Sequence, residues 1–362
     1  MTRSIAILNA SRKNDGITSV MRKTSNMLKA SGYEVKWYQV VDRYTMKSLP
    51  EHDCLINGFK HLPQAISMGL TRSMYIAKRF KPDKSELILI SEPTLINLVK
   101  GRENFIVRFH DFRAFTKYSD KFLTRLLYKK VLRNLKRIKF AIFSTEYVKS
   151  EAEKFEIRPQ LSIIIRDRSD YPPVKEHLNS SLKRIRGGKI TISCISTDRP
   201  YKNLHFFLQI ARLLENRSPG LYNFLLVTNP KKELSMELEA FGKIEIVQNV
   251  DDIGSIYDRT DIIVIPSKYE GFGLPLIEAA YYGIPPVLYC LPPFTETLGN
   301  YELFQNSYDE IKWAESIEGL CDPQTYERMS TFVLNRAMEI ENDRGSYKLK
   351  DFIDSVNKEC FS

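Results

Sequence analysis

Two glutamates on either side of a glycine-rich turn are the residues of this sequence most suited to chemistry. Glu270 and Glu278 lie eight residues apart. The apolar run at 262–265 predicts a buried strand before the turn, and apolar periodicity over 274–282 predicts a helix after it. The start of that helix therefore lies beside two carboxylates.

Such a helix start can bind an anion, because its backbone N–H groups and its dipole both favour negative charge. The turn residues whose amides can accept a diphosphate are Gly271, Phe272, Gly273 and Leu274. One carboxylate can then bond the hydroxyls of a sugar and the other those of a ribose. The alternative is an ordinary strand, turn and helix with Glu278 on a solvated face.

Two cations form a second candidate element of the same site. Arg199 and Lys202 follow an apolar strand predicted at 190–195 and precede a helix predicted at 204–214. A helix dipole disfavours cations at its start unless an anion is present. We therefore expect both side chains to bind a pyrophosphate, with surface cations as the alternative.

These two motifs resemble the donor site of retaining glycosyltransferases of family 4, which have the GT-B fold. The family has two glutamates with seven residues between them, as here, so the resemblance implies that Glu270 contacts the donor sugar and Glu278 binds the ribose. The family also has a pattern of glycine, arginine, four residues and lysine. The resemblance implies that Lys202, followed by Asn203, is the lysine that ends this pattern. This chain has Ser196 and Thr197 where glycine and arginine usually stand.

The N-terminal half resembles the family more loosely. Gly16 stands at the family's double-glycine loop, where Asp15 replaces the first glycine, and it allows a positive φ or the close approach of a ligand. His110 and Asp111 resemble the family's His-Asp pair. The resemblance implies that His110 is catalytic with Glu270 and Lys202, whereas a histidine bonded to a backbone carbonyl is the structural alternative. Asp111 either orients the ring or caps the next segment.

Two further turns carry weaker matches. The turn Ser144-Thr145-Glu146 resembles the family's serine turn at the end of a strand, or its hydroxyls cap the helix expected near Tyr147. Glu296 resembles the glutamate of a turn that closes over the nucleotide, or is a residue at a helix start favoured by the dipole.

Strand and helix patterns alternate along the whole chain, which predicts an α/β protein with parallel sheets. We expect two doubly wound Rossmann-like domains that face a central crevice. The boundary is the polar stretch broken by Pro172 and Pro173. The predicted parts are an acceptor-side domain at 1–170, a linker at 171–188, a nucleotide-sugar domain at 189–345 and a final helix at 346–362 that packs back towards the N-terminal domain.

The net charge of +10 comes from the N-terminal half, where residues 121–139 form a basic amphipathic helix without an acid. Its cations are Lys129, Lys130, Arg133, Lys136 and Arg137, among others. The helix is either a core element with a solvated face or also a patch for anionic lipid head groups. Nucleic acid is an unlikely partner because no recognition motif accompanies the charge.

The remaining features argue against a membrane-spanning, a secreted and a metal-binding protein. No segment approaches the length of a membrane span, and the N-terminus lacks a signal-peptide pattern, so we expect a cytoplasmic protein that is at most peripheral at the inner membrane face. Five scattered cysteines indicate reduced thiols. We expect neither a cofactor nor a metal, because no Asp-x-Asp pair or His/Cys cluster has ligand spacing.

The predicted activity is metal-independent, retaining transfer of a hexosyl group from a UDP or GDP sugar to an unknown acceptor, either lipid-linked or a surface glycan. Two alternatives stay open: a catalytically silent protein that binds sugar nucleotides or lipids, and a GT-B-like sugar-nucleotide epimerase.

Overall fold

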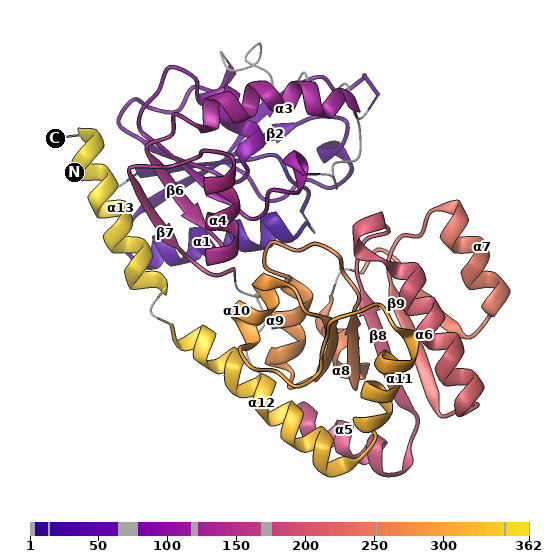
Figure 1. The fold of residues 1–362 in the computed structure, drawn as a ribbon. Coiled ribbons are helices and arrows are strands. Elements are labelled where there is room, and N and C mark those ends of the chain that lie inside the picture. Colours follow the sequence, from indigo (N-terminus) through magenta and orange to yellow (C-terminus); the bar gives the residue numbers. More distant parts are fainter. Residues whose placement is uncertain are drawn as a thin grey trace. The chain divides into compact units, whose positions relative to one another are not determined.

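The computed structural model describes residues 4–13, 15–63, 79–116, 122–167, 176–250, 252–343 and 345–361 (Figure 1). The chain divides into two compact units. One comprises residues 1–170 and 344–362, and the other comprises residues 171–343. Each unit has its own parallel sheet and its own apolar core.

The N-terminal unit contains a sheet of order β3-β2-β1-β4-β5-β6-β7 in its described part, with parallel neighbours throughout. Its strands are β1 (Ser4–Asn9), β2 (Glu34–Val41), β3 (Cys54–Asn57), β4 (Leu87–Ile90), β5 (Phe105–Phe109), β6 (Phe140–Phe143) and β7 (Leu161–Ile164). Its helices are α1 (Gly16–Ala30), α3 (Phe122–Leu135), α4 (Glu146–Lys154) and α13 (Gly345–Phe361), with short 3-10 helices η1 (Thr45–Lys47), η3 (Pro93–Val99) and η4 (Arg113–Phe115).

Both faces of this sheet are buried. Along β4, Leu87 and Leu89 belong to one apolar cluster and Ile88 and Ile90 to another. Alternate side chains of a strand point to opposite faces, so a strand covered on both sides reads as a continuous apolar run. This explains why the periodicity of the sequence identified the parallel sheet.

The last helix of the chain, α13, packs on the N-terminal unit. Leu349, Phe352, Ile353 and Val356 are buried in the cluster that contains Leu87 and Leu89. The Tyr33 hydroxyl donates a hydrogen bond to Asp354 of α13. The end of the chain is therefore part of the N-terminal core.

The C-terminal unit contains a sheet of order β10-β9-β8-β11-β12-β13, again with parallel neighbours. Its strands are β8 (Ile190–Ile195), β9 (Tyr222–Val227), β10 (Ile244–Val247), β11 (Ile262–Ile265), β12 (Pro286–Tyr289) and β13 (Phe304–Gln305). Its helices are α5 (Glu176–Gly187), α6 (Leu204–Arg217), α7 (Lys232–Phe241), α8 (Gly254–Arg259), α9 (Leu274–Tyr281), α10 (Pro292–Leu298), α11 (Glu310–Gly319), α12 (Pro323–Asn342) and the 3-10 helix η5 (Pro200–Lys202).

The segment expected as a linker at 171–188 differs from that expectation. Its described part forms α5, whose Leu182 and Ile185 lie in the core of the C-terminal unit. Arg184 Nε also donates to the buried Asp261 Oδ1 at 2.7 Å. The polar composition concealed an amphipathic helix, because the cationic residues between its apolar positions face outward or pair with Asp261. The short strands β3 and β13 were not predicted either.

The strand order reverses between β1 and β4 in the first sheet and between β8 and β11 in the second. In open α/β sheets, ligands bind outside the carboxyl ends of the strands at such reversals. The candidate residues of the C-terminal unit follow β8, β11 and, for Glu296, β12, and those of the N-terminal unit follow β1, β5 and β6. The fold therefore places each set at the edge of its sheet where ligands bind.

We predict that Ile353→Ala destabilises the N-terminal unit by about 2 to 5 kcal/mol, because it leaves a cavity under α13. Ile353 is fully buried, and it shares its cluster with Trp37. The chain has two tryptophans, so denaturant unfolding in a Trp313→Phe background can be followed by the fluorescence of Trp37. Tyr347→Ala, on the same helix but 68% exposed, is the matched control and should change the free energy of unfolding by less than about 0.5 kcal/mol. Equal effects of the two variants would contradict the packing of α13.

Candidate functional site

The C-terminal unit brings two of the predicted residues into direct contact. Lys202 Nζ donates to Glu270 Oε1 at 2.5 Å, and the Ser267 hydroxyl donates to the same oxygen at 2.8 Å. The side chains of Lys202 and Glu270 are only 15% and 11% exposed. A charge this deeply buried needs a partner, so each ion stabilises the other. Lys202 can exchange this carboxylate for a phosphate oxygen without leaving its place.

Local backbone geometry holds the two residues together. Lys202 ends η5, and Asn203 follows it in the left-handed conformation, with φ of 55°. The Lys268 amide donates to the Tyr201 carbonyl at 2.7 Å. This bond joins the turn after β8 to the turn after β11, and these two strands are neighbours in the sheet.

Gly273 is required at the start of α9. Its φ is 90°, and a Cβ atom at this position would lie 2.4 Å from Cε1 of Phe294. A side chain is therefore excluded both by backbone conformation and by packing. The N-terminus of α9 follows directly, with residues 271–274 in the position expected of diphosphate ligands.

Glu278 lies about one turn into α9. Its Oε2 accepts a hydrogen bond of 2.8 Å from the hydroxyl of Tyr257, a fully buried residue of α8. The Tyr257 ring stacks on Tyr282. The carboxylate is thus held by a rigid aromatic partner that the sequence did not reveal.

The other two predicted residues of this unit are Arg199 and Glu296. Arg199 is exposed and immediately precedes η5. Glu296 lies within α10 and not at its start, because Pro292 and Pro293 already form the first turn of that helix. Its structural alternative as a helix-start residue is therefore wrong.

Cys194, in β8, is buried near Lys202. Burial raises the pKa of its thiol to about 12, although the nearby Lys202 cation acts in the opposite direction. The thiol is therefore protonated and unreactive at neutral pH. All five cysteines of the chain are free.

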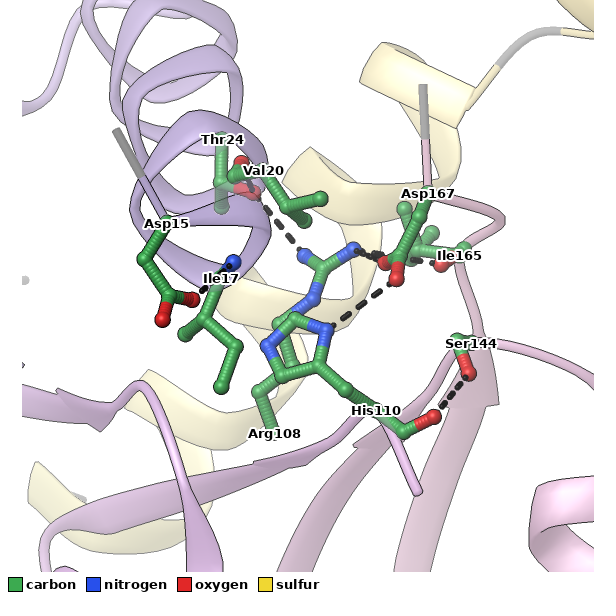
Figure 2. Close-up of polar contacts among 9 residues, drawn as sticks. All are labelled: Asp15, Ile17, Val20, Thr24, Arg108, His110, Ser144, Ile165 and Asp167. Carbon is green, nitrogen blue, oxygen red and sulfur yellow. Dashed lines mark hydrogen bonds and ion pairs between the residues drawn. The ribbon is translucent and has the colours of Figure 1, made fainter. Parts of the chain in front are cut away.

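The N-terminal unit surrounds His110 with a buried ionic network (Figure 2). His110 Nδ1 lies 3.1 Å from Asp167 Oδ2, and Arg108 Nη2 donates to Asp167 Oδ1 at 2.9 Å. Burial alone would raise the pKa of Asp167, but the neighbouring His110 and Arg108 outweigh it and lower that pKa. Asp167 is therefore a carboxylate at neutral pH.

Several backbone and side-chain bonds fix this network. Arg108 Nη1 donates to Thr24 Oγ1 of α1 at 2.9 Å, as Figure 2 shows. The Ser144 hydroxyl donates to the His110 carbonyl at 3.2 Å, so Ser144 supports the histidine backbone. Helix α4 is capped by Thr145, which accepts from the Val148 amide, and not by Ser144.

The remaining N-terminal candidates have structural roles. Asp111 Oδ1 accepts from the Arg113 amide at 2.9 Å, so it caps the next segment. Asp15 is the N-cap of α1 and accepts from the Ile17 amide at 3.0 Å. Gly16 is consequently the first helical residue, so it does not use the positive φ that a glycine allows. Burial raises the pKa of Asp15.

Arg108 and Asp167 were not among the predicted site residues. Asp167 was assigned to the polar stretch before Pro172, although it is almost fully buried. One signal was available: Arg108 interrupts an otherwise apolar strand, and a cation on a buried strand needs a buried anion. The sequence could not show which carboxylate supplies it.

The basic patch consists of Lys129, Lys130, Arg133, Lys136 and Arg137, at the end of α3 and just after it, and all five are exposed. Val131, Leu135 and Ile138 of the same segment are buried. Lys136 forms an ion pair with Glu156. At least one of these cations is therefore paired, although residues 121–139 themselves contain no acidic residue.

A cavity of about 710 Å³ in the C-terminal unit lies away from these residues. Tyr222 and Ile244 line it, and they begin β9 and β10, so the cavity lies at the amino edge of the sheet. Ligands of open α/β sheets bind at the carboxyl edge. We therefore assign the candidate site to the carboxyl edge and not to the cavity.

Among the residues that the structure describes, no three His, Cys, Asp or Glu side chains are grouped in a way that could hold a metal ion. In those same ranges, every helix is too short or too polar to span a bilayer.

Residues 178–333 match the family model described as glycosyl transferases group 1. This part of the chain is similar to that family. The chain is 26% identical over 244 residues to the O-antigen chain mannosyltransferase RfbU of Salmonella typhimurium. The match covers 64% of this chain and 65% of that relative, so the chain spans just under two thirds of its length.

Solved structures resemble the chain over nearly its whole length. Sucrose-phosphate synthase from Thermosynechococcus elongatus matches with a TM-score of 0.78 and 14% identity, over 98% of this chain and 99% of that one. Anabaena HepE in complex with UDP and glucose matches with a TM-score of 0.71 and 12% identity, over 99% and 98%. The expectation of two Rossmann-like domains of the GT-B fold is thereby confirmed.

We predict that Lys202→Ala weakens the binding of free nucleoside diphosphate by roughly 1.5 to 3 kcal/mol, the range for a hydrogen bond to a charged group. Titration calorimetry with UDP and with GDP measures this change. Lys243→Ala is a matched control, because Lys243 is 61% exposed and lies at the amino edge of the sheet. If the Lys202 variant and the parent bind the nucleoside diphosphate with equal affinity, Lys202 is not part of the site.

Proposed function

We propose that the protein is a retaining glycosyltransferase of family 4 that transfers a hexosyl group from a UDP or GDP sugar. The observation that carries the proposal is the pair formed by Lys202 and Glu270, a cation and a carboxylate held together beside the N-terminus of α9. The similarity of residues 178–333 to that family supports sugar transfer. The names of RfbU, a mannosyltransferase, and of HepE, solved with UDP and glucose, support a nucleotide-sugar donor.

In this proposal the cations act on the leaving group. The bond between the anomeric carbon and the phosphate oxygen breaks, and negative charge builds on the departing diphosphate. Lys202, Arg199 and the amides of residues 271–274 neutralise that charge, so the scheme requires no metal ion bound by side chains. Preorganised donors of this kind supply much of the stabilisation of a transition state.

The carboxylates and the histidine act on the sugar and ribose. Glu270 bonds the donor sugar, Glu278 binds the ribose, and His110 stabilises the positive charge that develops on the sugar ring. We favour attack by the acceptor hydroxyl on the same face from which the diphosphate leaves, with the hydroxyl proton passing to the diphosphate. The anomeric configuration is then retained.

We further propose a lipid-linked acceptor, used at the cytoplasmic face of a membrane. The exposed cations of the basic patch support this choice, because anionic head groups attract such clusters. A surface glycan is the alternative acceptor.

A silent sugar-nucleotide-binding protein is the second candidate, favoured by Asp15 at the N-terminus of α1, where a carboxylate opposes the binding of an anion. Incubation with a panel of labelled UDP and GDP sugars separates the candidates. Release of nucleoside diphosphate indicates a transferase, an altered sugar still attached to its nucleotide indicates an epimerase, and binding without turnover indicates the silent protein.

We predict that Glu270→Gln abolishes transfer while the affinity for free nucleoside diphosphate stays equal or rises. The amide keeps the shape of the side chain but removes the charge that occupies Lys202, so the diphosphate gains an unshared cation. Turnover with the donor found in the panel and calorimetry with its diphosphate measure the two effects. Glu245→Gln, an exposed glutamate at the other edge of the sheet, is the control and should match the parent. Near-normal turnover in the Glu270 variant would overturn the central assignment.

We predict that the protein co-sediments with vesicles containing acidic lipids and not with neutral ones. Each cation near such a surface contributes about 1 kcal/mol, and salt screens that attraction. Conversion of Lys129, Lys130, Arg133, Lys136 and Arg137 to glutamine should release the protein and leave donor hydrolysis unchanged.

The control for this experiment carries an equal change of charge elsewhere. Five exposed cations of the C-terminal unit are converted to glutamine: Lys231, Lys232, Lys243, Lys312 and Arg328. This variant should still bind acidic vesicles. If the parent ignores acidic vesicles at low salt, the basic helix is a core element with a solvated face and a soluble acceptor is favoured.

A further inference from the structure

Arg108 and His110 share one carboxylate, and this sharing restricts the chemistry of the histidine ring. Arg108 is 1% exposed, and its guanidinium can only donate hydrogen bonds. It donates to Asp167 Oδ1, to Thr24 Oγ1 and, at 3.3 Å, to the Ile165 carbonyl. These acceptors come from α1 and from the segment that follows β7, so the guanidinium and the carboxylate are fixed in place (Figure 2).

The second oxygen of Asp167 faces the ring. An ionised carboxylate only accepts hydrogen bonds, so the proton of the 3.1 Å contact with His110 must lie on Nδ1. In a neutral imidazole, Nε2 then carries the lone pair. Nε2 is buried and has no hydrogen-bond partner among the described residues. It is therefore the ring atom that remains for a ligand.

We propose that Asp167 is a positioning residue for His110: held by Arg108, it fixes the ring in the tautomer protonated on Nδ1 and presents Nε2 to the reacting sugar. The contact with the sugar rests on the proposed function, whereas the tautomer depends only on the buried network. Arg108 has two tasks here. It keeps Asp167 ionised, and it occupies Oδ1 so that Oδ2 alone faces the histidine.

The tautomer is tested by substitution of Asp167 with asparagine. Arg108 needs an acceptor and will take the amide oxygen, so the amide nitrogen, which only donates, will face Nδ1. Asp167→Asn is therefore expected to move the ring proton from Nδ1 to Nε2. Nitrogen-15 NMR of labelled histidine rings in the full chain, without substrate and about two pH units above the ordinary pKa of imidazole, reports which nitrogen is protonated.

The five histidines of the chain make the assignment tractable. His110→Gln identifies the signals of His110. His177 serves as an internal control, because its ring contacts Ser181 and Tyr282 and lies in the other unit. Its signals should stay unchanged in the Asp167 variant, which shows that the C-terminal unit of the variant is folded.

A second variant separates positioning from structure. Adding Arg108→Met to Asp167→Asn removes the donor that claims the amide oxygen, so this oxygen can turn to the histidine and accept its Nδ1 proton. The double variant is expected to restore the parental tautomer. A merely structural role of the ion pair predicts the opposite order, with the double variant more perturbed than the single one.

Kinetics with the donor found in the panel complete the test. Asp167→Asn should lower kcat by roughly 100-fold or more with little change in KM, because a ring protonated on the wrong nitrogen still leaves the binding groups intact. The double variant should recover part of that loss. If kcat is unchanged while the tautomer moves, the positioning role is overturned. A parental ring protonated on Nε2 overturns the tautomer assignment itself. If no donor is turned over, the proposed function fails, whereas the ring signals still decide the tautomer.

Discussion

The burial of both faces of each parallel sheet is the constraint on which the rest of the structure depends. Strands such as β4 and β11 are apolar at every position, so they leave no place for a functional side chain along their length. Apart from Arg108 within β5, the functional groups emerge where strands end, and neighbouring parallel strands end at the same edge. The functional groups of each unit are therefore gathered by the topology and not by any single motif.

Within each unit, a buried ion pair then determines which groups at the carboxyl edge of the sheet are available to a ligand. Lys202 and Glu270 neutralise each other in the C-terminal unit, as Arg108 and Asp167 do in the N-terminal unit. The two pairs differ in the contacts that hold their cations. Arg108 is anchored by acceptors on two segments, which suits a permanent part of the scaffold. Lys202 reaches Glu270 from a short turn, which suits an ion that exchanges its partner when an anion arrives.

Sequence patterns predicted the sheets and the donor motif because both are local. Period and length identify a buried strand, and the spacing of Glu270, Gly273 and Glu278 identifies a turn that starts a helix. The partners of these residues lie far away along the chain, as Phe294 does for Gly273, Tyr257 for Glu278 and Asp167 for His110. Such pairings depend on which strands become neighbours, and composition carries no record of that. The helix α5 was concealed for a related reason, since the acid that pairs with Arg184, Asp261, lies three strands further along the chain.

The buried thiol of Cys194 has a consequence for the redox behaviour of the protein. It lies in β8, and burial holds its pKa at about 12. Oxidants and alkylating agents react with thiolates, so this sulfur is protected at neutral pH even though a lysine lies near it. The partly exposed Cys54 and Cys290 can react in its place. Oxidative damage should thus reach the outer parts of both units before it reaches β8, the strand that precedes Lys202.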